Sequence, residues 1–417
     1  MLSKIFKLIN LEKLCALYVV LWIFIPPVQV GTIYRVLAVG CAALWFLFVL
    51  FRDTSLFNKI GKFCLIGFLC AALMILYSLF VFPVTTAIIR NLQFIIMLIC
   101  GAMAAYYMQT DKTFLQILIG ACLIGMIIFC CTTTYALIND PYAARIANSE
   151  WLEGRFEANK NVGLYGYIYM CVLIAPMLLY KIIKKIKLNP IMDTLFLIAF
   201  VLIVIMTTFS GYMIANFCLV AGCGLVIMFK RITPVRCIIF FGSILVFAIF
   251  YQDLVEIFFD TLSKIFGENP AYGQKISEFK MLFLDGNASG VTVDERFSNY
   301  SDSFELIYQY PIIGSLLCGQ RGGGGHSAVF DMIGKYGWLT SVLYFYVFWK
   351  FPFEIYKNQS KQTIKLLMLI FIFFSFFNPY SQELSIALFL FFPYVIYIAD
   401  NHALTKTKNG TSVNEQR

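Results

Sequence analysis

The stretch Leu195–Met206, which reads LFLIAFVLIVIM, is apolar at every position and decides the fold class. Leu366–Phe377, LLMLIFIFFSFF, repeats the pattern near the other end of the chain. A transmembrane β-strand would alternate apolar and polar residues over about ten positions, whereas these stretches are apolar on every side. With 60% hydrophobic and only 13% charged residues, the chain has too little polar surface for a soluble globule. We therefore predict an all-α polytopic membrane protein.

Apolar runs of this kind predict about twelve transmembrane helices, because a hydrocarbon core needs about 20 apolar residues per crossing. Basic residues gather between alternate runs, as at Lys181–Lys187, and this positive-inside bias places both termini in the cytoplasm. The predicted spans cover residues 12–30, 34–51, 63–82, 88–107, 114–137, 162–180, 191–209, 212–229, 236–251, 337–353, 364–379 and 383–399.

Two predicted outer loops are too long to be mere connections, so we expect the chemistry outside the membrane. Spans one to nine fall within 1–251 and include the first loop, 138–161; the large loop is 252–336, the last three spans occupy 337–399, and 400–417 is a cytoplasmic tail. Within the large loop, Leu254–Phe266 predicts an amphipathic helix lying flat on the outer leaflet. Asp302, three residues before Glu305, predicts the start of a second short helix that ends at Pro311.

Neither a metal nor another cofactor is expected. Of the 13 cysteines, all except Cys318 lie inside or at the edge of apolar runs, which indicates neither disulfides nor metal ligands. There is no Asp-x-Asp pair, and the first outer turn, Val28–Thr32, contains no acid. The net charge of +9 is divided into short clusters between spans, so nucleic acid is not an expected partner.

Arginines in the outer loops are candidate phosphate ligands, because the planar guanidinium holds phosphate oxygens in pairs and cannot lose its charge. Arg155, Arg296 and Arg321 are the strongest candidates, and Arg145 in the first loop and Arg90 at the outer end of the fourth span are further ones. Lysines in the same loops are more simply explained by ion pairs with acids of these loops, namely Glu150, Glu153, Glu157, Asp294 and Glu295. These lysines are Lys160, Lys264, Lys275 and Lys280.

His326 is the histidine best placed for chemistry, at the junction between the large loop and the tenth span. An imidazole can accept a proton from a sugar hydroxyl or donate a hydrogen bond to a phosphate near neutral pH. The preceding Gly322, Gly323, Gly324 and Gly325 can turn backbone N–H groups toward an anion, although a merely flexible loop explains them too. Asp331 stands four residues before Lys335, so we expect a helical ion pair there rather than a catalytic base.

Residues 295–340 resemble the signature of the O-antigen ligase and polymerase superfamily. His326-Ser327 precedes Gly337-x-x-Thr340 at the family's interval, with threonine where glycine is more usual. Glu295-Arg296-Phe297 and the segment Tyr310–Gly314, YPIIG, are similar to the family's arginine and Pro-leu-x-Gly segments. Near Phe209-Ser210-Gly211 the family often has Ser-Arg; this chain lacks that arginine, which leaves Arg90 or Arg145 to replace it.

The resemblance implies a GT-C-like fold and inverting, metal-independent glycosyl transfer at the outer face of the bacterial cytoplasmic membrane. A growing glycan would leave undecaprenyl pyrophosphate and join an acceptor hydroxyl. Arg155, Arg296 and Arg321 would hold the departing pyrophosphate, His326 would deprotonate the acceptor or bind phosphate, and Ser327 belongs to the same motif.

We expect a polymerase of O-antigen or capsule, whose acceptor is another lipid-linked repeat unit. Its partners would be that oligosaccharide, membrane lipid and a chain-length regulator. A ligase that transfers glycan to the lipid A core shares the histidine motif and stays open. A secondary transporter is a third reading, disfavoured because charges at mid-span are absent from the sequence.

Overall fold

The computed structural model describes residues 11–26, 28, 32–52, 55–140, 142–152, 161–210, 212–228, 251–266, 273–274, 276–277, 280, 291–320, 325–350, 361–381 and 383–400. Every regular element in these residues is helical, as the apolar pattern predicts. Five helical segments are long and apolar enough to cross a membrane: Ile33–Arg52, Gly61–Leu79, Lys112–Asn139, Tyr165–Ile183 and Pro190–Phe209. The chain is therefore an all-α protein with the composition of a membrane-embedded bundle.

The helices overlap every predicted span except 236–251, of which only Tyr251 is described. Spans ten and twelve contain π-helical turns, η2 and η3. In chain order the elements are α2 (Leu11–Phe24), α4 (Thr32–Arg52), α5 (Ser55–Leu79), α6 (Val84–Thr110), α7 (Lys112–Asn139), α8 (Ala143–Leu152), α9 (Tyr165–Ile183), α10 (Pro190–Phe209), α11 (Met213–Met228), α13 (Tyr251–Phe266), α15 (Val291–Gln309), the 3₁₀ turn η1 (Leu316–Cys318), α16 (Ala328–Phe345), η2 (Tyr346–Lys350), α18 (Lys361–Phe377) and η3 (Ile386–Phe391).

Polar residues in the breaks between apolar runs fix where several helices begin. The Asp111 carboxylate accepts from the Phe114 N–H at 2.9 Å and caps α7. The Asn189 side chain accepts from the Met192 N–H at 2.7 Å, and Pro190 occupies the first turn of α10. Each cap satisfies a backbone donor that the helix itself leaves without a partner, so the polar breaks determine the helix starts.

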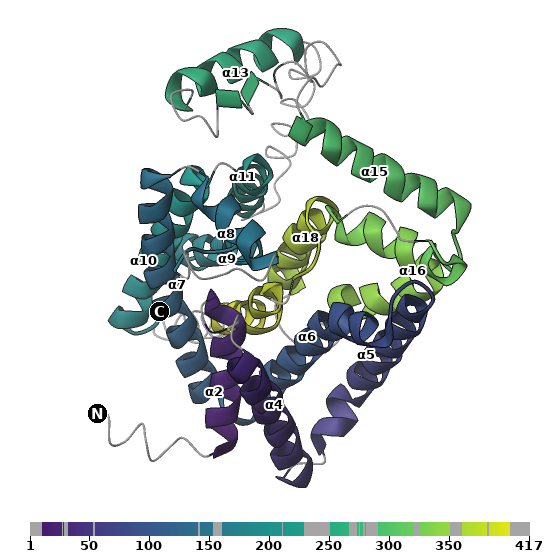
Figure 1. Cartoon of the computed structure of the whole chain (residues 1–417). Coiled ribbons are helices and arrows are strands. Elements are labelled where there is room, and N and C mark those ends of the chain that lie inside the picture. Colours follow the sequence, from purple (N-terminus) through teal and green to yellow (C-terminus); the bar gives the residue numbers. More distant parts are fainter. Residues whose placement is uncertain are drawn as a thin grey trace, which may run out of the picture.

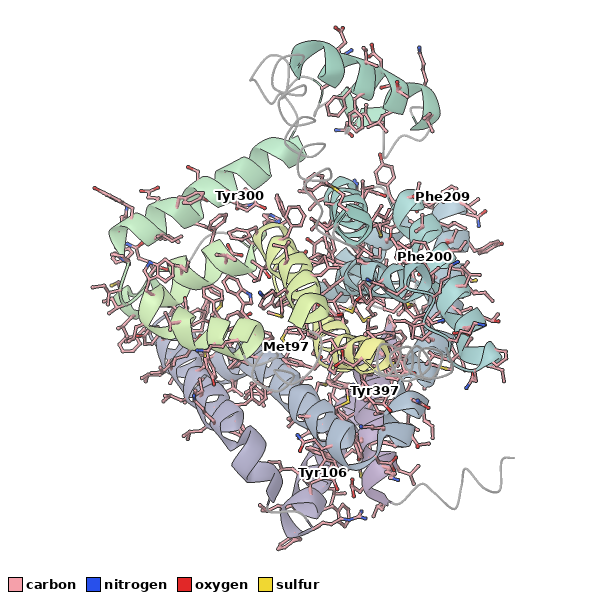
Figure 2. All side chains as sticks on the ribbon, turned by 180° about the vertical axis from the view of Figure 1, so that it is seen from behind. Met97, Tyr106, Phe200, Phe209, Tyr300 and Tyr397 are labelled. Carbon is pink, nitrogen blue, oxygen red and sulfur yellow. The ribbon has the colours of Figure 1, made fainter. Side chains whose placement is uncertain are left out.

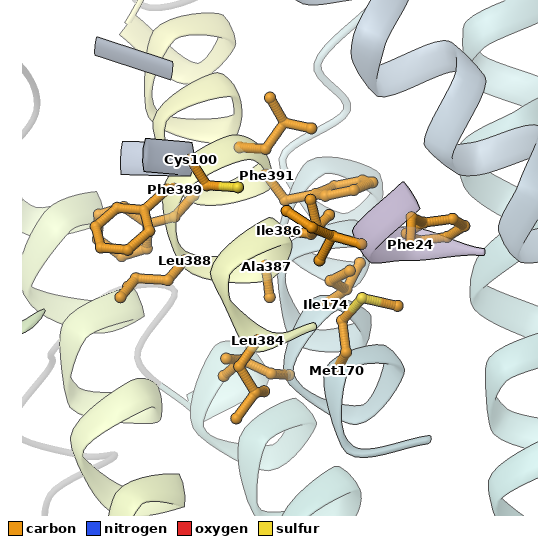
Figure 3. Packing of buried hydrophobic residues seen from close by; sticks show 14 of the residues in the cluster. Phe24, Cys100, Met170, Ile174, Leu384, Ile386, Ala387, Leu388, Phe389 and Phe391 are labelled. Atoms are coloured by element: carbon orange, nitrogen blue, oxygen red, sulfur yellow. The ribbon is translucent and has the colours of Figure 1, made fainter. Parts of the chain in front are cut away.

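The centre of the bundle is formed by α9 and the C-terminal segment that contains η3. In the 18-residue apolar stretch of α9, 78% of the length is buried inside the protein, whereas only 22% of the corresponding stretch of α4 is buried. Helix α9 is therefore central and α4 peripheral. All residues of η3 are buried, and η3 contacts α2, α6, α7 and α9. Figure 3 shows Phe389 and Phe391 of η3 beside Cys100 of α6, and Met170 and Ile174 of α9 next to each other in the same core. Close packing of this kind stabilises a bundle in lipid, where the hydrophobic effect contributes little.

One end of the bundle is joined by two ion pairs. Glu12, which is buried, accepts hydrogen bonds from the Tyr107 hydroxyl at 2.9 Å and from Arg52 at 3.1 Å. Lys13 Nζ donates to Asp111 at 2.5 Å. These contacts bring together the start of α2, the end of α4 and the turn between α6 and α7, all of which the charge pattern assigns to one side of the membrane.

The Asp111 carboxyl in that turn has a pKa below its ordinary value of 3.8. Burial alone would raise the pKa of Asp111, but hydrogen bonds from Lys13 and from the backbone N–H groups of Phe114 and Thr113 outweigh the burial. The ionised form of Asp111 is thus favoured by folding.

Helix α13 stands apart from the bundle, at the top of the view in Figure 1. Ile257, Phe258 and Ile265 are exposed on it, as the predicted amphipathic helix requires. Lys280 pairs with Asp260 at 2.6 Å and with Glu256 at 3.8 Å, and the Asp260 hydrogen bond raises the pKa of Lys280. Lys280 thus forms ion pairs, as predicted, but its partners are acids of α13 rather than the expected Glu150, Glu153, Glu157, Asp294 or Glu295.

Helix α15 runs along the edge of the molecule beside α16 (Figure 1). It begins at Val291, so the predicted start at Asp302 is wrong, whereas the predicted end before Pro311 is confirmed. The Asp302 and Glu305 pattern is also compatible with a helix interior, where Glu305 instead accepts from Gln309 at 2.8 Å. Tyr300, labelled on α15 in Figure 2, donates from its hydroxyl to the Phe376 carbonyl of α18 at 3.4 Å.

Candidate functional site

The two resemblance segments YPIIG and His326–Thr340 meet at a break in α16. Gly337 interrupts this helix with φ 67° and ψ 173°, a conformation essentially restricted to glycine. The Trp338 N–H donates to the Pro311 carbonyl at 2.9 Å and the Leu339 N–H to the Ile312 carbonyl at 3.3 Å. A Cβ on Gly337 would lie 2.2 Å from the Ile312 oxygen. The turn after α15 thus fills the break and supplies the acceptors that the helix lacks there.

Helix α16 begins at Ala328 rather than at the predicted boundary of the tenth span, residue 337. The predicted boundary coincides with the break at Gly337, so residues 328–336, which we expected in the large loop, form the first half of the helix. The start is capped by Ser327, whose Oγ accepts from the Phe330 N–H at 3.2 Å and donates to the Ser375 carbonyl at 3.4 Å. Ser327 therefore has a structural role in addition to its predicted place in the motif.

Asp331 holds both neighbours of His326. Its Oδ2 accepts from the backbone N–H of Gly325 at 2.7 Å and of Ser327 at 3.2 Å, and its Oδ1 accepts from the Ser303 hydroxyl of α15 at 3.0 Å. The carboxylate is buried, and in the described part of the chain no ion pair joins it to Lys335. The predicted ion pair is wrong because hydrogen bonds to the loop occupy the carboxylate instead. Hydrogen bonds to a buried charge are among the strong ones, so the backbone on both sides of His326 is fixed.

The imidazole of His326 itself is half-buried, and its Nδ1 is shielded from solvent. The loop that carries His326 is also hydrogen-bonded to the connection between α18 and η3. The Ala328 N–H donates to the Asn378 carbonyl at 3.1 Å, and the Asn378 side chain accepts from the Tyr165 hydroxyl of α9 at 2.8 Å. A residue between α18 and η3 thus connects the histidine loop to the central helix.

A cavity of about 280 Å³ lies directly beside this loop. Its lining includes both neighbours of His326, Gly325 and Ser327, together with Asp331 and Lys335 of α16. Met97 of α6, labelled in Figure 2, also lines the cavity. The remaining lining residues come from α5, the α5–α6 connection, α6, η1, α16 and the α18–η3 connection: Met74, Ser78, Phe82, Asn91, Phe94, Leu316, Ala328, Met332, Tyr336, Tyr344, Pro379 and Tyr380.

The polar wall of the cavity is rigid because its groups bond to one another. Asn91, buried in α6, donates to the Ser78 hydroxyl at 3.1 Å and to the Ala87 carbonyl at 2.8 Å. Its side-chain oxygen accepts from the Tyr336 hydroxyl at 3.2 Å. Asn91 is therefore positioned by three helices, α5, α6 and α16, and it keeps Tyr336 in place across the cavity.

Arg145 of α8 lies among tyrosines. Its Cζ is 5.4 Å from the Tyr142 ring centroid and 5.7 Å from that of Tyr212, a cation–π arrangement. Tyr212 packs against Tyr165 with ring centroids 5.7 Å apart, and Tyr165 is hydrogen-bonded to Asn378. Continuous contacts therefore run from Arg145 to the start of α16, next to His326.

The other predicted site residues are placed only in part. Arg90 belongs to the first turns of α6, directly before Asn91, and Arg296 belongs to α15, whose Ser303 reaches Asp331. The side chains of both arginines are outside the described part of the structure. Arg155, Arg321 and Gly322–Gly324 lie outside the described residues altogether.

Asn91, Asn378 and the clamping role of Asp331 were missed by sequence reasoning. An asparagine inside an apolar run, such as Asn91, indicates a buried polar contact, because a polar side chain in a span needs partners inside the protein. Asp331 stands four residues after the helix-capping Ser327, and this spacing also indicates a contact, since an acid near the helix start can accept a hydrogen bond from the cap backbone. Asn378 ends an apolar run before Pro379 and carries no comparable pattern.

Among the described residues, no three histidine, cysteine, aspartate or glutamate side chains gather in a way that could hold a metal ion. The cavity is lined instead by one buried carboxylate, one ammonium group, the side-chain amide of Asn91, hydroxyl groups and aromatic rings, and His326 stands between the lining residues Gly325 and Ser327. Comparison of the chain with protein-family models, with curated proteins and with solved structures finds no match in any of the three.

Proposed function

We propose that the chain is a glycosyltransferase that polymerises a lipid-linked polysaccharide outside the membrane. The single observation that carries this proposal is the arrangement around Asp331. One buried carboxylate fixes both neighbours of His326 beside a cavity of about 280 Å³, at the point where the YPIIG turn meets α16. The YPIIG turn thus contacts the segment after Gly337, and Ser327 of the histidine motif borders a space for a ligand.

In the proposed reaction, an acceptor hydroxyl of a lipid-linked repeat unit attacks the anomeric carbon of the glycan carried by undecaprenyl pyrophosphate. A new C–O glycosidic bond forms, the bond from that carbon to the phosphate oxygen breaks, and undecaprenyl pyrophosphate leaves with the electron pair. His326 either takes the hydroxyl proton or donates a hydrogen bond to the phosphate. Arg296, Arg321 and Arg155 would stabilise the charge that develops on the leaving group.

Reaction with purified protein and lipid-linked repeat units tests the proposal. The wild-type protein should convert single units into longer lipid-linked chains and release undecaprenyl pyrophosphate. His326→Ala should lower the rate about 10²–10⁴-fold if the imidazole transfers the proton. The matched control is His402→Ala, which removes the only other histidine of the chain and should leave the rate unchanged. Unchanged chain growth with His326→Ala would remove His326 from the mechanism.

The same variants in a deletion strain separate the alternatives. Loss of a polymerase leaves single repeat units on the final acceptor, whereas loss of a ligase leaves full-length glycan on the lipid carrier. Loss of a transporter strands the precursor inside the cell. Arg296→Ala should reproduce the polymerase phenotype while the protein still inserts into the membrane, and normal chain-length ladders from it would exclude a role for this arginine.

A further inference from the structure

The cavity beside the His326 loop is lined by one cationic side chain that forms no ion pair with any described residue. Lys335 is the one cationic side chain in the described lining, and none of the described residues forms an ion pair with its Nζ. Asp331, the one acid in the same lining, already accepts hydrogen bonds at both oxygens, from Ser303 and from the backbone of Gly325 and Ser327. The ammonium group is therefore available to an anion that enters the cavity.

The cavity walls suit a single sugar ring. Phe82, Phe94 and Tyr336 offer aromatic surface, and Asn91 and Ser78 add a polar edge, the mixture found in small-molecule pockets. The volume of about 280 Å³ is just below the lower end of such pockets, about 300 Å³, so one ring fits rather than an oligosaccharide or a lipid chain. A lysine and a polar edge also make the cavity unsuitable for a purely apolar ligand.

We infer that this cavity binds one acidic sugar residue of the glycan, with the ring against the aromatic wall and its carboxylate or phosphate on Lys335 Nζ. The inference rests on the proposed polymerase function and names the class of sugar in its substrate. A lysine is a compact single charge that matches one carboxylate or one phosphate monoester, whereas a pyrophosphate is better held by the paired donors of arginine. A neutral sugar would leave the ammonium group in the cavity without a direct anionic partner.

Ligand-detected NMR on the full-length protein in detergent tests this inference with glucuronic acid, glucose 1-phosphate and glucose as probes. At least one acidic sugar should bind, about tenfold or more tightly than glucose. Lys335→Met should weaken that binding about ten- to hundredfold, the loss expected for a hydrogen bond to a charged group. Binding of glucuronic acid alone would identify a carboxylated sugar, and binding of glucose 1-phosphate alone a phosphorylated one.

The matched control is Lys365→Met, which removes an exposed lysine of α18 that does not line the cavity and should bind the acidic sugar as the wild type does. If Lys335→Met does not fold, as judged by its melting temperature, Lys335→Gln takes its place. Equal binding of glucose, unchanged binding in the Lys335 variant, or equally tight binding of inorganic phosphate or acetate would overturn the inference. Binding is measured without turnover, so a protein that binds acidic sugar but extends no glycan contradicts only the proposed function.

Discussion

Replacement of Gly337 by alanine should destabilise the protein by about 2–6 kcal/mol. Alanine at φ 67° and ψ 173° costs about 1–3 kcal/mol in backbone strain. The new Cβ would lie 2.2 Å from the Ile312 oxygen, where an ordinary contact begins at 3.4 Å, so the YPIIG turn must move by about 1.2 Å. That movement breaks the hydrogen bonds from Trp338 and Leu339, at about 0.5–1.5 kcal/mol each.

Thermal unfolding of the purified protein in detergent, followed by tryptophan fluorescence, measures this loss. For a chain of 417 residues the expected drop in melting temperature is about 2–7 °C. Gly224→Ala is the matched control, because nothing lies within 4 Å of a Cβ at this helical glycine of α11. That variant should be neutral or slightly stabilising, since alanine favours a helix by about 1 kcal/mol over glycine.

A second substitution tests whether the contact between the two segments is responsible. Gly314 has φ 75°, and a Cβ there would lie 2.4 Å from the Gly337 nitrogen. Gly314→Ala should therefore cause a similar loss, and the double variant should lose much less than the sum because both changes break the same contact. A Gly337→Ala protein that melts at the wild-type temperature, or a double variant with fully additive losses, would refute the reasoning.

Two further predictions concern hydrogen-bonded carboxylates, of which Asp331 is buried and Asp111 is partly buried. Asp331→Ala removes the acceptor for Gly325, Ser327 and Ser303 and should destabilise the protein by about 1.5–3 kcal/mol in the same melting assay. Asp331→Asn should cause a smaller loss. Equal melting temperatures of the wild type and both variants would contradict the role of Asp331 in holding the His326 loop. Folding lowers the pKa of Asp111 below 3.8, so its stabilising contribution is present above that pH and is lost as the pH falls through the folded-state pKa. Melting temperatures measured from pH 6 to about pH 3 should therefore fall less steeply for Asp111→Asn than for the wild type, and parallel curves would exclude this contribution.

The sequence predicts the helical class because a long apolar run such as Leu195–Met206 has only one way to satisfy its backbone in lipid. It also predicts the end of α15, since Pro311 cannot continue a helix. The start of α15 is not predictable from Asp302, because an acid three residues before Glu305 occurs both at caps and in helix interiors.

The candidate site is harder to predict because its contacts join distant parts of the chain. The obvious neighbour of Asp331 in sequence is Lys335, but its carboxylate bonds Ser303, 28 positions away. Tyr336 and Asn91 are separated by 245 positions. Local patterns identify which residues are unusual in an apolar chain, whereas only the packing of α5, α6 and α16 determines which of them meet.

The distribution of thiols provides a direct way to locate the site relative to the bilayer. Most described cysteines are buried or partly buried, and the exposed Cys131 lies in the apolar helix α7, whereas Cys318 is exposed in η1, next to the turn that fills the break in α16. An alkylating reagent that cannot cross membranes reacts with an exposed thiolate in water far faster than with thiols held in an apolar environment. The native chain therefore carries its own attachment point for an impermeant probe, eight residues before His326, without the introduction of a new cysteine.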